Sequence, residues 1–111
     1  IVAPEDDGGM PDVLKNAIDW MSRPPGGAAL FRGKPVALIG AATGGFGTAL
    51  AQAHWLPVLR HLGMRPWFDA RLVVPRAGEI CDDRGDLIDE ATRLRLEEFV
   101  QGFAGFCAKA P

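Results

Sequence analysis

The chain has 111 residues, with 12 Lys or Arg against 14 Asp or Glu, so its formal net charge is -2. This length predicts a single domain. A slightly acidic chain without a basic stripe is unsuited to the phosphate backbone of nucleic acids, which requires clustered positive charge. No apolar run approaches the roughly 20 residues of a membrane-spanning helix. We therefore expect neither a nucleic-acid partner nor a membrane.

The cysteines and histidines give no sign of a disulfide framework or a metal centre. Two cysteines, Cys81 and Cys107, are too few for a disulfide scaffold. They predict free thiols in a reducing compartment, and hence a cytoplasmic protein. His54 and His61 stand on one expected helix with no further His or Cys at ligand spacing. The sequence predicts no metal site.

The first unit along the chain is a strand end, a loop and a helix. Ile1–Ala3 is apolar and predicts the last residues of a strand, and Gly8 and Gly9 mark a turn. Pro11 suits the first turn of a helix, where its missing N–H has no cost. Apolar residues then recur at helical spacing, which predicts a helix over 11–22. The apolar residues of this pattern are Met10, Val13, Leu14, Ala17, Ile18 and Met21.

The second unit repeats this order with a glycine-rich loop. Residues 24–27 read Pro-Pro-Gly-Gly and end the first helix. Pro35 can open a strand, and the apolar run 36–39 predicts a central parallel strand covered on both faces. The loop 40–47 holds four glycines. A helix is expected over 48–62, ended by Gly63.

The third unit completes an alternating pattern. We expect a strand over 67–74, a solvated turn over 82–85, and a last helix capped by Asp86 or Asp89. Six residues share one face of that helix at helical spacing and predict a core contact: Ile88, Thr92, Leu96, Phe99, Phe103 and Phe106. Alternating strands and helices predict an α/β fold with a parallel sheet.

Three segments carry a resemblance to a known family. The run 14–20 reads Leu-Lys-Asn-Ala-Ile-Asp-Trp, residues 33–37 read Gly-Lys-Pro-Val-Ala, and residues 44–48 read Gly-Gly-Phe-Gly-Thr. Together they resemble the NAD(P)H-dependent FMN reductases. The resemblance implies a flavodoxin-like three-layer fold with strand order 2-1-3-4-5. On this alignment residues 1–111 form one partial domain that holds strands 3–5 with their helices.

The resemblance also implies a function. The chain would belong to an NAD(P)H-dependent FMN oxidoreductase of the flavin or quinone reductase type, with NADPH or NADH as co-substrate and a small-molecule electron acceptor. It implies a homodimer formed through the helices over 11–22 and 48–62. No residue is expected to be catalytic, because hydride transfer is the chemistry of the cofactor. Two loops would border the flavin ring, through Pro4, Glu5, Asp6, Asp7, Ala41, Ala42, Thr43, Gly44, Gly45 and Phe46.

The chain departs from the family pattern in ways that leave alternatives open. Asp6 and Asp7 stand where the family has Tyr and Asn, and Ala42 and Thr43 where it often has Ser and Pro. No segment resembles the family's phosphate-binding loop, so we expect weak FMN binding by this chain alone. The alternative is a non-catalytic flavodoxin-like dimerisation domain that has lost its cofactor. An electron-transfer flavodoxin is disfavoured, because Phe46 is the only aromatic residue available to flank the ring.

Overall fold

The main helices and strands follow one another in the predicted order, with two departures. The run 36–39, predicted as one strand, is interrupted at residues 37–38, and the short helices Gly27–Phe31 and Ala77–Ile80 were not predicted. The structure is a computed structural model that describes residues 1–109. The elements are α1 Asp12–Met21, α2 Gly27–Phe31, β1 Pro35–Val36, β2 Ile39–Ala41, α3 Ala49–His61, β3 Arg65–Pro66, β4 Leu72–Val74, α4 Ala77–Ile80 and α5 Glu90–Ala108. The helices α1 and α3, which correspond to the predicted ranges 11–22 and 48–62, begin and end within one residue of those ranges.

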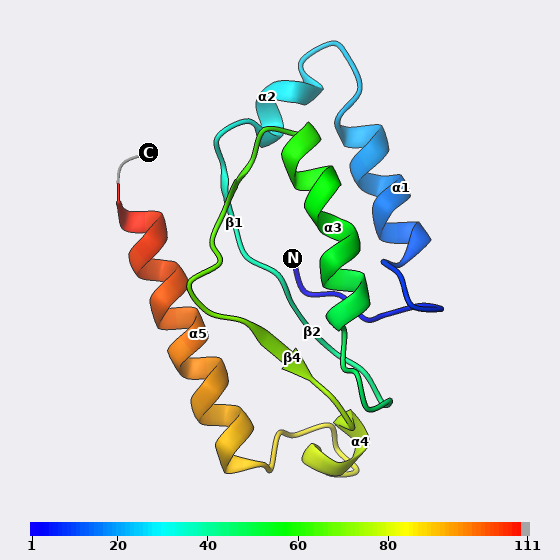
Figure 1. Cartoon of the computed structure of the whole chain (residues 1–111), viewed down its shortest axis with the longest axis vertical. Coiled ribbons are helices and arrows are strands. Elements are labelled where there is room, and N and C mark those ends of the chain that lie inside the picture. Colours follow the sequence, from blue (N-terminus) through cyan, green and yellow to red (C-terminus); the bar gives the residue numbers. More distant parts are fainter. Residues whose placement is uncertain (110–111) are drawn as a thin grey trace.

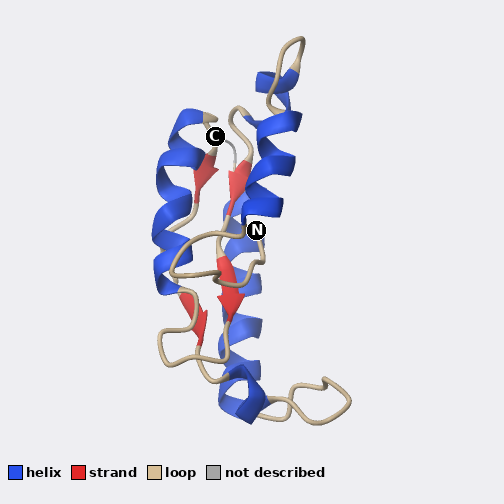
Figure 2. Ribbon diagram, turned by 90° about the vertical axis from the view of Figure 1, so that its right-hand side faces the viewer, coloured by secondary structure: helices blue, strands red, loops and turns tan. Residues whose placement is uncertain are grey.

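Every strand pair in the described residues is parallel. β1 pairs with β3 and β2 pairs with β4, so the strands form two successive pairs along the molecule (Figure 2). Val2 forms a further parallel bridge with Ile39. Two backbone hydrogen bonds fix this register, from Ala3 N–H to Ile39 O at 3.1 Å and from Ile39 N–H to Ile1 O at 3.0 Å. The predicted strand end at residues 1–3 is therefore the neighbour of β2.

The prediction of one strand over 67–74 was wrong. Val36 pairs with Pro66 and Ile39 with Leu72, so residues 37–38 on one side face residues 67–71 on the other. The surplus of three residues cannot stay in register, and the chain leaves the ladder between β3 and β4. Trp67 remains buried there, because its ring meets that of Phe99 edge to face at 5.0 Å.

Helices cover the two faces of the strands unequally (Figure 1). α1 and α3 lie on one side and α5 lies on the other. On the α1 and α3 side the buried core consists of Ile18, Phe31, Val36, Leu38, Trp55 and Leu59. On the α5 side it consists of Ala37, Trp67, Leu72 and Phe99. No helix within residues 1–109 combines the length and apolarity needed to cross a bilayer.

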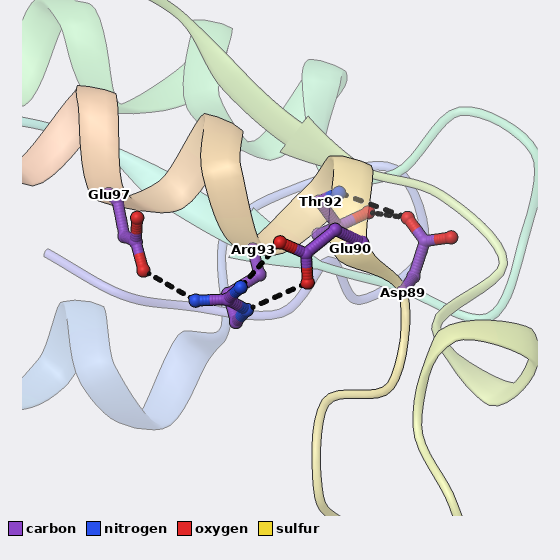
Figure 3. Close-up of polar contacts among 5 residues, drawn as sticks. All are labelled: Asp89, Glu90, Thr92, Arg93 and Glu97. Atoms are coloured by element: carbon purple, nitrogen blue, oxygen red, sulfur yellow. Dashed lines mark hydrogen bonds and ion pairs between the residues drawn. The ribbon is translucent and has the colours of Figure 1, made fainter.

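The last helix begins at a side-chain cap (Figure 3). Of the two proposed capping residues Asp89 is the one used, since its Oδ2 accepts hydrogen bonds from Thr92 N–H at 3.0 Å and Thr92 Oγ1 at 2.6 Å. These bonds lower the pKa of Asp89, because they stabilise the ionised carboxylate. The phenylalanine face of α5 packs on the strands as predicted, but Ile88 lies before the helix and is 62% exposed.

We predict that the Asp89 cap stabilises the fold in a pH-dependent way. A folded-state pKa below the ordinary value means that the contribution is complete above about pH 4 and is lost as the pH falls through the folded-state value. Asp89→Ala should lower the melting temperature at neutral pH, with a smaller difference in acid. Asp89→Asn keeps an acceptor oxygen and should retain most of the stability. Thermal melts followed by circular dichroism at both pH values test this, and equal losses at both would contradict it.

Candidate functional site

The loop over residues 4–9, hereafter the first loop, is closed by its own backbone. Asp6 N–H donates to Gly9 O at 3.0 Å, and Gly9 N–H donates to Asp6 O at 2.8 Å. Between them Asp7 and Gly8 adopt left-handed φ values of 47° and 76°, the pattern of a tight two-residue turn. Asp tolerates this conformation better than most residues. The side chains of Asp6 and Asp7 consequently lie exposed at the loop tip.

The loop over residues 41–47, hereafter the glycine loop, is held against the end of β4. Ala42 N–H donates to Val74 O, Arg76 N–H to Gly44 O, and Ala77 N–H to Ala42 O, each at 3.0 Å. Gly44 and Gly45 stay exposed, and nothing lies within 4 Å of the position that a Cβ on Gly44 would occupy. The loop therefore presents bare backbone to its surroundings.

A carboxylate joins the first loop to the helix that follows the glycine loop. Glu5 Oε2 accepts hydrogen bonds from Leu50 N–H and Ala51 N–H, both at 3.0 Å. These are N–H groups of the first turn of α3, which have no partner inside the helix. The N-cap residue Thr48 leaves them free because its hydroxyl accepts from Gln52 Nε2 instead, at 3.1 Å. Glu5 thus caps α3 from a distant part of the chain.

The segment before the first loop packs most closely against β2 at Gly40. A Cβ there would lie 2.1 Å from Ala3 O and 2.7 Å from Thr48 Oγ1, so only glycine fits. The end of the first segment, β2 and the start of α3 meet at this point. The structure therefore brings residues 4–7 and 41–46 to the same edge of the parallel strands, which is the edge where open α/β sheets bind ligands.

The electrostatic character of the two loops differs. The first loop borders an open hollow of about 630 Å³ lined by Glu5, Asp6, Asp7, Met10 and Asp12. The glycine loop carries no charged side chain of its own, but Arg76 lies beside it, with Nη2 3.9 Å from the Cβ position of Gly45. Arg76 is not among the site residues predicted from the sequence. Its place directly after the third strand end was the available signal.

The two loops differ in the chemical groups that they would present to a flavin ring. Exposed main-chain N–H groups beside a Cβ-free loop can donate to ring carbonyls and nitrogens at close range. Two acidic side chains on the opposite loop oppose the build-up of negative charge on the ring. These are the features of the two loops on which a role beside a flavin ring would rest.

We predict that Gly40→Ala destabilises the protein strongly. The added methyl group would collide with backbone at Ala3 and with Thr48, so the free energy of unfolding should fall by about 3 kcal/mol or more. Gly105→Ala is the matched control, because nothing lies within 4 Å of its Cβ position. Alanine is favoured over glycine inside a helix by about 0.5–1 kcal/mol. Urea unfolding measures both, and equal effects would contradict the crowding at Gly40.

Parallel strands covered by helices on both sides, with two loops meeting at the strand ends, define an α/β protein of the ligand-binding, flavodoxin-like class. Residues 1–79 match the family model described as NADPH-dependent FMN reductase. The chain belongs to this family, as the three sequence motifs predict.

Relatives and a solved structure agree with this assignment. A 2-hydroxy-1,4-benzoquinone reductase of a Burkholderia species is 38% identical over 106 residues, covering 96% of this chain and 57% of that protein. An NAD(P)H-dependent FMN reductase of Pseudomonas aeruginosa is 41% identical over 98 residues, covering 88% and 52%. The flavoenzyme NAD(P)H:(acceptor) oxidoreductase FerB from Paracoccus denitrificans superposes with a TM-score of 0.82 at 35% identity, covering 96% of this chain and 58% of FerB.

These comparisons decide the fold and the family. The likeness to FerB confirms the flavodoxin-like fold. The predicted dependence on FMN and NAD(P)H agrees with the family description and with the names of these relatives. The chain spans about half the length of the curated relatives that it matches. The ring-binding role of the ten residues in the two loops stays a prediction.

Proposed function

We propose that this chain is the part of an NAD(P)H-dependent FMN oxidoreductase that borders the flavin ring. The observation that carries the proposal is that the first loop and the glycine loop follow neighbouring parallel segments, residues 1–3 and β2, and so lie at one edge of the strands. Pro4 to Asp7 would lie beside the ring, and Ala41 to Phe46 would border its opposite polar edge. The family assignment makes FMN the ligand that this edge would hold.

The roles of the chain are binding and orientation. FMN, when bound, supplies the hydride chemistry. Main-chain N–H groups of the glycine loop would donate to the ring, and Phe46, which is 79% exposed, would shield it from water. A small electron acceptor would take the reducing equivalents. Relatives named for quinones favour a quinone in this role.

The phosphate of FMN would have to be held elsewhere. Hydrogen bonds to charged groups contribute about 1.5–3 kcal/mol each. The absence of about three of them corresponds to about 6 kcal/mol, or about four decades of affinity. We propose that FMN binding by these 111 residues alone is weak, and that a phosphate-binding segment outside them completes the site.

We predict that the double substitution Asp6→Tyr with Asp7→Asn strengthens FMN binding. It would remove two negative charges beside the ring and add an aromatic neighbour, and Asn tolerates the left-handed φ of 47° at position 7. Titration followed by quenching of flavin fluorescence measures the affinity. A second double variant, Asp83→Asn with Glu98→Gln, removes two exposed charges outside both loops and should leave the affinity unchanged.

The titration also tests the proposed function. Quenching that grows with the first double substitution supports a flavin pocket between the loops. The decisive titration uses a protein that also carries the proposed phosphate-binding segment. Unquenched FMN with every variant in that protein contradicts the proposed function, and favours the alternative of a non-catalytic dimerisation domain that has lost its cofactor.

We further propose a cytoplasmic homodimer formed through α1 and α3. Large apolar side chains on these helices face outward, with Val13 78%, Trp20 74% and Leu50 51% exposed. Apolar side chains that gather into a contiguous exposed patch mark interaction sites, and we propose that these residues belong to such a patch. The neighbouring residues Lys15 and Asp19 form a surface ion pair at 2.7 Å, which would fix the orientation of the contact.

We predict that Trp20→Ser weakens self-association. Exposed tryptophans are frequent binding hot spots, and loss of one commonly costs 2 kcal/mol or more, so the dimer dissociation constant should rise at least about tenfold. Light scattering over a concentration series measures it. Phe68→Ser is the control, because Phe68 is 63% exposed on the segment between β3 and β4. An unchanged dissociation constant in Trp20→Ser, or a monomeric parent chain, would contradict the proposed interface.

A further inference from the structure

We propose that Glu5 is a positioning residue that sets the spacing between the first loop and the glycine loop. Its carboxylate holds the first loop on the amino end of α3, one turn after the glycine loop ends. The inference deepens the proposed function and rests on it, since the spacing matters for a flat ring bound between the loops.

The contacts of the first loop single out Glu5. Within residues 1–109, the only hydrogen bonds from residues 4–9 to another segment are those of Glu5 Oε2 with Leu50 N–H and Ala51 N–H, at 3.0 Å each. The remaining backbone bonds of this loop join Asp6 to Gly9 inside the turn. Without Glu5, the tip that carries Asp6 and Asp7 would keep its internal turn but have no hydrogen bond to α3. Only the packing of Gly8 and Gly9 beside Leu50 and His54 would then hold it on the helix.

The helix depends on Glu5 as much as the loop does. Thr48 is the residue that would ordinarily cap α3. Its side chain is buried and engaged with Gln52, whose Nε2 also donates to Leu72 O at 2.9 Å. The first-turn N–H groups of α3 are therefore left to a residue 45 positions away. A shift of the first loop is transmitted directly to the end of the glycine loop.

This role changes the charge expected at the ring. A carboxylate that accepts from two N–H groups at the positive end of a helix has its charge compensated locally. Glu5 is then a support for the site and not a third acidic group facing the flavin. The acidic character of the first loop toward the ring rests on Asp6 and Asp7.

The test compares Glu5→Ala, Glu5→Gln and Glu98→Gln with the parent chain. Glu98 is exposed on α5, so its variant controls for loss of one charge. We expect Glu5→Ala to weaken FMN binding at least about tenfold, the change in affinity that corresponds to about 1.4 kcal/mol. Glu5→Gln keeps an acceptor oxygen with a weaker, uncharged bond and should recover part of the loss.

Two further measurements separate positioning from general stability. Amide hydrogen exchange at Leu50 and Ala51 should accelerate in Glu5→Ala and much less in Glu5→Gln, with the other amides of α3 unchanged. The midpoint potential of bound FMN should move toward that of free FMN in Glu5→Ala, because Asp6 and Asp7 are no longer held beside the ring. Glu98→Gln should match the parent in all three measurements.

The outcomes for the clamp and for the proposed function are distinguishable. FMN affinity and potential that are unchanged in Glu5→Ala overturn the positioning role and leave the proposed function standing. Unchanged exchange at Leu50 and Ala51 shows that the Glu5 carboxylate does not protect these N–H groups, and overturns the proposed attachment of the first loop to α3. If a protein that also carries the proposed phosphate-binding segment fails to bind FMN, both in its parent form and with Asp6→Tyr and Asp7→Asn, the proposed function falls. The exchange data alone then decide whether Glu5 holds the first loop on α3.

Discussion

The attachment of residues 1–9 to the rest of the chain is the constraint on which the site depends. The hydrogen bonds between Ala3, Ile1 and Ile39 place this segment beside β2, and Gly40 permits the approach. Glu5 then joins the loop that follows to α3. Because strand pairing, close packing and a helix cap act at successive positions, the two loops meet in one fixed arrangement. Removal of any of these contacts would separate the residues proposed to border a flavin.

The two faces of the strands explain how such a short chain keeps this arrangement. α1 and α3 cover one face with a core that includes Trp55 and Leu59, which are almost wholly inaccessible to solvent. α5 covers the other face through Trp67 and the phenylalanine side chains. The departure of residues 67–71 from the ladder serves this second contact, since it leaves Trp67 buried against Phe99. Both layers thus anchor the strands whose ends carry the loops.

The chemistry of the site follows from what the two loops present. The glycine loop offers backbone with no side chain in the way, and the first loop offers carboxylates. The backbone N–H groups of the glycine loop would stabilise negative charge on a bound ring, whereas the carboxylates of the first loop would destabilise it. The balance between them, and not a dedicated acid or base, would set how readily a bound flavin accepts and releases electrons. On the proposed function, the protein would tune the redox properties of a bound flavin, and the flavin would supply the hydride chemistry.

The amino-acid sequence by itself determined the order of helices and strands, the parallel fold and the family. These properties depend on local periodicity, on glycine and proline positions, and on the run from Leu14 to Trp20. The tertiary structure decided the partner of Glu5, the break around Trp67 and the position of Arg76 beside the glycine loop. Each of these results from contacts between residues far apart in the chain, and local patterns do not encode which distant groups meet. The sequence therefore predicted both loops of the proposed site, whereas only the folded chain revealed the hydrogen bonds by which Glu5 attaches the first loop to α3.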